Sequence, residues 1–192
     1  MASNNVEIEI KFPVSRALFQ KVKKFLKAHA VFGGASKEKD SYFNHPHRDF
    51  LAGGHPTEYL RVRQRGGAGS FTYKNVYLNK FGSRTHSDEF ESKVEEPGQV
   101  IKILKVLNFK KFLVVKKKRE TYIFEGKYEI ALDDVKDLGY FIEIEALDNA
   151  GGVQKTRRRI FEFSKELGIQ KLRKTNGYVI DLMRKKGLIG EM

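Results

Sequence analysis

The sequence predicts an α+β fold in which an antiparallel sheet, or a closed barrel, carries its helices on the outside. Two patterns predict it. About eight stretches of the 192-residue chain alternate apolar and polar side chains, as strands do, and most are joined by short turns typical of hairpins. Three or four further stretches repeat apolar residues at helical spacing. Their apolar stripes need a surface to cover, and one side of each strand supplies it.

The first expected strand, residues 5–12, alternates most strictly. Its apolar side chains are Val6, Ile8, Ile10 and Phe12, and its other side carries Glu7, Glu9 and Lys11. Two carboxylates two residues apart on a strand lie roughly 6.6 Å apart along the chain and point the same way. This spacing suits oxygen ligands for a hard divalent cation, with a lysine beside them for an anion. An ordinary amphipathic strand with a solvated face has the same pattern.

The remaining elements follow in chain order. Pro13 and Ser15 start a helix whose apolar stripe ends at Leu26, and the pair Gly33-Gly34 breaks the chain after it. Further strands are expected at residues 39–43, 58–65, 70–77, 84–94, 109–124, 128–133 and 139–146. Further helices are expected from Pro97 to about residue 107, at 150–168 and at 176–186.

The loop at residues 44–56 contains three histidines, His45, His47 and His55. No carboxylate or cysteine has a matching spacing, and the surrounding proline and glycine residues do not favour a rigid site. The loop is therefore not expected to bind a transition metal.

Length and composition narrow the class of protein. A single domain over residues 1–192 is expected, and the absence of cysteine excludes disulfides, thiolate metal sites and cysteine nucleophiles. No apolar run approaches transmembrane length and the N-terminus is polar, so a cytoplasmic protein without a membrane partner is expected. The 37 Lys and Arg residues against 24 Asp and Glu give a formal net charge of +13. Such an excess favours a polyanionic partner, such as nucleic acid, a membrane surface or a phosphate-rich small molecule.

The ionised sides of the strands form a second pattern. Arg and Lys are concentrated on the middle strands, whereas Glu and Asp are concentrated on the first and last, which become neighbours in a closed barrel. Carboxylates would then gather on one wall and face cations on the other. This arrangement fits a metal-bound polyphosphate, because Arg and Lys satisfy phosphate oxygens and carboxylates hold Mg²⁺ or Mn²⁺.

These residues also resemble a known family in order and spacing over roughly residues 5–185. The matching motifs are Glu7-x-Glu9-x-Lys11, Leu60-Arg61-Val62-Arg63, Lys74, Lys117-Lys118-Arg119, Asp133 after Ile130-Ala131-Leu132, and Glu143-Ile144-Glu145. Each motif is weak alone, but the ordered set is specific. The chain resembles the CYTH superfamily of triphosphate tunnel metalloenzymes, and within it the class IV adenylyl cyclase branch, whose C-terminal segment is similar to residues 177–182.

The resemblance implies an eight-stranded antiparallel barrel with a tunnel that binds a triphosphate, and helices packed outside it. It assigns the metal, Mg²⁺ or Mn²⁺, to Glu7, Glu9, Glu143 and Glu145. It assigns the triphosphate contacts to Lys11, Arg61, Arg63, Lys74, Lys117 and Arg119, and roles in the reaction to Glu9, Asp133, Lys117 and Arg119. It further implies a homodimer.

The sequence departs from the family pattern on one strand. Relatives carry an arginine two residues before a pair of glutamates, whereas here Ser87 precedes Glu89 and Glu91. Arg84 is the candidate substitute. The His-Phe pair found upstream of the first motif in the cyclase branch is also absent.

Three functions compete. The first is cyclisation of ATP to cyclic AMP with release of pyrophosphate. The second is hydrolysis of inorganic triphosphate, thiamine triphosphate or a nucleoside triphosphate, which uses the same charges. The third is a non-enzymatic polyphosphate-binding or RNA-binding module. Paired glutamates on the end strands would repel a nucleic-acid backbone, so no nucleic-acid partner is expected.

Overall fold

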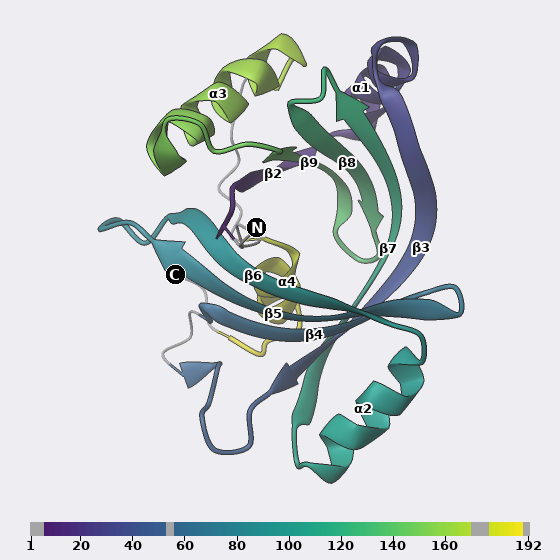
Figure 1. The fold of residues 1–192 in the computed structure, drawn as a ribbon, viewed down its shortest axis with the longest axis vertical. Coiled ribbons are helices and arrows are strands. Elements are labelled where there is room, and N and C mark those ends of the chain that lie inside the picture. The colour runs from purple at the N-terminus through teal and green to yellow at the C-terminus, as the bar shows by residue number, and fades with distance from the viewer. Residues whose placement is uncertain (1–5, 53–55, 170–176, 190–192) are drawn as a thin grey trace.

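The computed structural model describes residues 6–52, 56–169 and 177–189. Nine antiparallel strands in this part of the chain form one sheet that coils into a nearly closed barrel (Figure 1). The order across the sheet is β1-β6-β5-β4-β3-β7-β8-β9-β2. The strands are β1 Val6–Glu7, β2 Glu9–Val14, β3 Val31–Asn44, β4 Glu58–Arg65, β5 Ala68–Leu78, β6 Arg84–Val94, β7 Lys110–Phe124, β8 Tyr128–Val135 and β9 Gly139–Ala146. The helices are α1 Arg16–His29, α2 Pro97–Val106, α3 Gly152–Glu166 and α4 Tyr178–Lys185.

The barrel closes through the first stretch of the chain. Strand β1 pairs with β6 through Glu7 and Ser87, and β2 pairs with β9 through Glu9 and Glu145. Ile8, between the two strands, is buried. The single strand expected at residues 5–12 is therefore divided at Ile8, which is why the sheet has nine strands instead of eight; residue 5 lies outside the described residues.

Two expected boundaries are wrong. Pro13 does not start a helix but belongs to β2, where it lies opposite Phe141. Helix α1 begins at Arg16 instead, because the Ser15 side chain accepts a hydrogen bond from the Leu18 amide and caps it. The pair Gly33-Gly34 does not break the chain either. Strand β3 runs through it with a shift in its register against β7, and Gly34 has a φ of 137°, which favours glycine.

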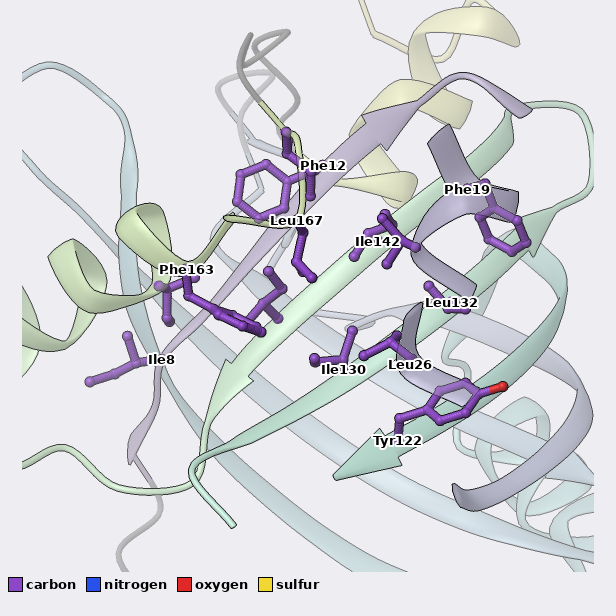
Figure 2. Packing of buried hydrophobic residues seen from close by; sticks show 14 residues of the cluster. Ile8, Phe12, Phe19, Leu26, Tyr122, Ile130, Leu132, Ile142, Phe163 and Leu167 are labelled. Carbon is purple, nitrogen blue, oxygen red and sulfur yellow. The ribbon is translucent and has the colours of Figure 1, made fainter. Parts of the chain in front are cut away.

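Helices α1 and α3 cover the outer face of β2, β9, β8 and β7. Figure 2 shows this core, in which Leu26 of α1 and Phe163 of α3 pack against the outward side chains of the strands. The strand residues in it include Ile8, Phe12, Tyr122, Ile130, Leu132, Ile142 and Ile144. Helix α2 covers a smaller core over β3 and β4, built around Phe43, Phe50, Leu60, Val62 and Leu104. The predicted packing of apolar strand faces against helices is confirmed.

Helix α4 lies across one end of the barrel (Figure 1). Its residues Tyr178, Val179, Leu182 and Met183 pack against a third apolar cluster from six strands. The strand residues of that cluster are Tyr42, Tyr59, Val76, Leu113, Val115, Val135 and Phe141. Leu113 and Val115 share a side of β7 with Lys117 and Arg119, because side chains two residues apart on a strand point the same way. The barrel interior is thus apolar near α4 and ionised beyond it.

Candidate functional site

The ionised side chains line one cavity of about 580 Å³ inside the barrel. All nine strands and the first residues of α4 contribute to its wall. The sequence-predicted residues on the wall are Glu7, Glu9, Lys11, Arg61, Arg63, Lys74, Lys117, Arg119, Glu143 and Glu145. The alternation therefore placed the charged sides of the strands correctly. Asp133 is the exception, because it has no exposed surface and lies behind Arg119.

Carboxylates gather where the first and last strands meet. Glu9 lies directly opposite Glu145 and Lys11 directly opposite Glu143 in the β2–β9 pair. The Lys11 ammonium bridges this wall, with Nζ 2.5 Å from Glu9 Oε2 and 3.1 Å from Glu143 Oε2. The predicted neighbourhood of the first and last strands is confirmed by this register.

A second lysine joins the carboxylate wall to β6. Lys74 of β5 forms ion pairs with Glu7, with Glu9 at 3.2 Å and with Glu89 at 2.9 Å. Lys74 and Lys11 are both largely shielded from water. Their ion pairs therefore hold in place the carboxylates of β1 and β2 and those of the neighbouring strands β6 and β9.

The carboxylate wall has the chemistry of a divalent cation site. Burial, together with repulsion from the neighbouring carboxylates Glu7, Glu9, Glu143 and Glu129, raises the pKa of Glu145 to about 9. A cation placed there would relieve this repulsion, and carboxylate oxygens are the ligands that Mg²⁺ and Mn²⁺ prefer. Among the described residues no three acidic or histidine side chains already form a metal site, and Lys11 and Lys74 bridge the carboxylates instead. The donor set fits the metal, and its assignment to these glutamates stays a prediction.

The raised pKa of Glu145 predicts that the folded protein loses stability as the pH rises. Its folded-state pKa of about 9 lies above the usual 4.5, so the folded chain binds this proton more tightly than the unfolded chain. The resulting stabilisation is complete below pH 4.5 and is lost as the pH rises toward 9. With a chelator present, we expect wild type to lose stability relative to Glu145→Gln between about pH 6 and about pH 8. Thermal unfolding of both proteins across this range measures the difference, and parallel curves would contradict the prediction.

Asp133 is the centre of a buried network that adjoins the carboxylate wall at Glu143. Arg119 donates to both its oxygens, Nε to Oδ1 at 2.7 Å and a terminal nitrogen to Oδ2 at 2.6 Å. The same Arg119 nitrogen lies 2.7 Å from Glu143 Oε2. The Tyr178 hydroxyl also donates to Asp133 Oδ2, at 2.6 Å. Asp133 thus orients Arg119, whereas Arg119 itself lines the cavity.

The charges within this network determine which of its side chains are ionised. Burial alone would raise the pKa of Glu143, but the charges of Arg119, Lys11 and Lys117 outweigh it and hold the pKa well below its usual range. Burial lowers the pKa of Lys117 to about 8, and repulsion from Arg119 acts in the same direction. Lys117 is therefore short of negative charge, which a bound phosphate would supply.

A second buried network was not predicted. Arg63 donates to both oxygens of Asp40, at 2.8 and 2.7 Å, and its Nε lies 3.1 Å from Glu38 Oε2. Glu38 also lies 3.4 Å from Lys117 Nζ. Arg63 reaches the cavity with its guanidinium already held on one side. The alternation of Glu38, Asp40 and Tyr42 was the available signal, but the expected strand began only at Lys39.

The strand that departs from the family pattern still supplies a cation. Arg84 lines the cavity and one of its terminal nitrogens lies 4.0 Å from Glu9 Oε1; its role as the substitute stays a prediction. Ser87 instead donates a hydrogen bond to Glu7 at 3.2 Å. Glu89 and Glu91 both lie near Arg61, at 3.5 and 3.1 Å.

Sequence reasoning also missed the tyrosines and Glu129. Tyr42, Tyr59, Tyr178 and Glu129 line the cavity, and only the strand alternation could have indicated the two on β3 and β4. The His45 ring accepts hydrogen bonds from the His47 and Arg48 amides, as in a turn; His55 lies outside the described residues.

In the part of the chain that the structure describes, no helix is long and apolar enough to cross a membrane.

The fold and the cavity together define a class of protein, an antiparallel barrel that encloses matched cations and carboxylates suited to a polyanion. Comparison with known proteins names the family. The profile of the CYTH domain matches residues 5–179, so the chain belongs to the CYTH family. The resemblance found in the sequence is confirmed, and the barrel is the tunnel fold of that family.

Individual relatives agree with this. The chain is 32% identical over 167 residues to a protein of Methanocaldococcus jannaschii provisionally named an adenylate cyclase, covering 86% of this chain and 90% of that one. A solved structure from Pyrococcus horikoshii superposes with a TM-score of 0.75 at 29% identity, covering 93% of this chain and 99% of the other. A Hippeastrum protein, provisionally named an adenylyl cyclase and described as having a dominant triphosphatase activity, has the same fold, with a TM-score of 0.66 at 17% identity over 94% of this chain and 95% of its own.

Proposed function

We propose that the protein is a divalent metal-dependent enzyme that acts on a triphosphate held in the barrel, and that it converts ATP to cyclic AMP and pyrophosphate. One observation carries the triphosphate site. Cations from β2, β4, β5 and β7 and carboxylates from β1, β2 and β9 converge on a single cavity inside the barrel. The choice of cyclisation is supported by the provisional name of the M. jannaschii relative, which matches most of both chains.

In this reaction the ribose 3′-hydroxyl oxygen attacks the α-phosphorus, and the bond from that phosphorus to the bridging oxygen of pyrophosphate breaks. Lys11, Lys74 and Arg61 hold the outer phosphates from the walls on which they lie, and Lys117 and Arg119 approach from β7. Charge that develops on the leaving pyrophosphate is stabilised by these fixed cations. Glu7, Glu9, Glu143 and Glu145 would hold the divalent cation, which would neutralise phosphate charge and lower the pKa of the attacking hydroxyl.

A second candidate, hydrolysis of the terminal phosphate, is favoured by the lining of the cavity. Among the described residues on the wall the aromatic side chains are Tyr42, Tyr59 and Tyr178, and all three are buried against the apolar cluster beside α4. They leave no exposed ring on which an adenine base would stack. A triphosphate without a base needs no such ring, and water would be the attacking nucleophile.

The two reactions differ in their products. The protein is incubated with ATP, inorganic triphosphate or thiamine triphosphate, each with Mg²⁺ or Mn²⁺, and cyclic AMP, pyrophosphate and orthophosphate are measured separately. We expect cyclic AMP and pyrophosphate in equal amounts from ATP, and none after chelation of the metal. Orthophosphate as the main product would indicate hydrolysis of the terminal phosphate and would contradict cyclisation. If the protein binds these substrates but turns over none of the three, the proposal that it is an enzyme is rejected.

A further inference from the structure

The hydroxyl of Tyr178 connects α4 to the charged site. It donates to Asp133 Oδ2 at 2.6 Å and lies 3.3 Å from Glu143 Oε2. Tyr178 is the first residue of α4, the helix that packs across one end of the barrel. The contact therefore joins the helix at the end of the barrel to the network that orients Arg119.

Asp133 is a buried carboxylate that depends on its hydrogen-bond donors. It has no exposed surface, and its donors are Arg119, Lys117 at 3.4 Å and the Tyr178 hydroxyl. Arg119 and Lys117 also line the cavity, where a phosphate chain would compete for them. A buried carboxylate that loses its donors carries a large desolvation cost, because no water replaces them.

We propose that Tyr178 is a positioning residue that keeps Asp133 hydrogen bonded while Lys117 and Arg119 turn to the phosphate chain. This inference rests on the proposed function, since it requires a triphosphate in the cavity. Tyr178 is suited to the task because its hydroxyl donates a hydrogen bond to Asp133 without adding a charge to the site. Without its hydroxyl, the two cations would remain committed to Asp133, and triphosphate would bind less tightly.

The surroundings of the ring make a clean test possible. The Tyr178 ring packs edge-on against Phe141, with centroids 4.8 Å apart, and the ammonium groups of Lys11 and Lys117 lie 5.7 and 5.4 Å from its centroid. Phenylalanine would keep all of these contacts and remove only the hydroxyl. Tyr122→Phe is the matched control, because its hydroxyl also donates to a carboxylate, Glu120 at 2.9 Å, but in the outer core instead of the cavity.

The test is calorimetric titration of inorganic triphosphate into the full chain with a chelator present. We expect Tyr178→Phe to bind about tenfold more weakly than wild type, and Tyr122→Phe to bind as wild type does. In the Asp133→Asn background, removal of the Tyr178 hydroxyl should cost no further affinity, because an amide does not carry the charge that the hydroxyl serves. Thermal unfolding of each variant verifies that it is folded at the temperature of the titration.

The outcomes separate this inference from the proposed function. Equal affinities of wild type and Tyr178→Phe would overturn the inference alone. Additive losses in the double variant would overturn it too, since they would indicate a general effect on packing. A wild-type protein that binds no triphosphate here, and turns over none of the three triphosphates with Mg²⁺ or Mn²⁺, would overturn the proposed function and the inference with it.

Discussion

Replacement of Glu143 by glutamine is expected to lower turnover of the triphosphate substrate by at least about 100-fold, because loss of a supporting residue of a metal site already costs 10–100-fold. Glu143 is 7% exposed and contacts both Arg119 and Lys11. Glutamine keeps its size and one acceptor oxygen but removes the charge that would hold a divalent cation. The measurement is the initial rate of product release with saturating Mg²⁺ and with saturating Mn²⁺.

Glu120→Gln is the control for this change. Glu120 lies on β7 next to Arg119, but its carboxylate accepts a hydrogen bond from Tyr122 and pairs with Lys23 of α1 outside the cavity. It should turn over substrate at the wild-type rate. If Glu143→Gln also keeps the wild-type rate, Glu143 does not hold the metal, and the carboxylate wall has another purpose.

Replacement of Asp40 by asparagine is expected to lower the free energy of unfolding by about 3 kcal/mol, the lower end of the cost of breaking a buried ion pair. Asp40 is 2% exposed and receives two hydrogen bonds from Arg63, so asparagine would leave a buried guanidinium with Glu38 as its remaining acid. Burial would raise the pKa of Asp40, but Arg63 holds it below its usual range, so the pair is ionised when folded. Urea unfolding monitored by circular dichroism measures the loss.

A pair on the surface provides the comparison. Glu125 and Lys127 are 2.7 Å apart in the turn between β7 and β8, and both side chains are more than half exposed. Removal of an exposed pair of this kind costs less than about 1 kcal/mol, so Glu125→Gln should unfold at nearly the wild-type urea concentration. Equal losses in the two variants would show that the Asp40–Arg63 pair has no special role in stability.

Much of the barrel could be predicted because its strands alternate strictly. Side chains on alternate positions point to opposite faces, so Lys117 and Arg119, or Glu143 and Glu145, had to share a side once the strand was recognised. The prediction failed where local sequence gives ambiguous signals. Gly33 and Gly34 are typical of a chain break, yet β3 passes through them, and the shortened expected strand concealed Glu38.

The position of α4 could not be predicted for a different reason. An amphipathic helix has the same apolar stripe whether it packs on the outer face of a sheet or across the end of a barrel. Only the tertiary structure shows that Tyr178 reaches Asp133, a residue 45 positions earlier in the chain. The role of Asp133 was also beyond sequence reasoning, because a motif does not show whether a carboxylate faces the ligand or supports an arginine.

The division of the first stretch at Ile8 has a consequence for synthesis on the ribosome. Its two halves pair with β6 near residue 87 and with β9 near residue 145, so neither partner exists when this stretch is made. The nascent chain must keep an alternating strand unpaired until most of the polypeptide has emerged, and such non-local pairing is slow and open to aggregation. The charges of Glu7, Glu9 and Lys11 then serve a second purpose, since ionised side chains protect an unpaired edge from pairing with another chain.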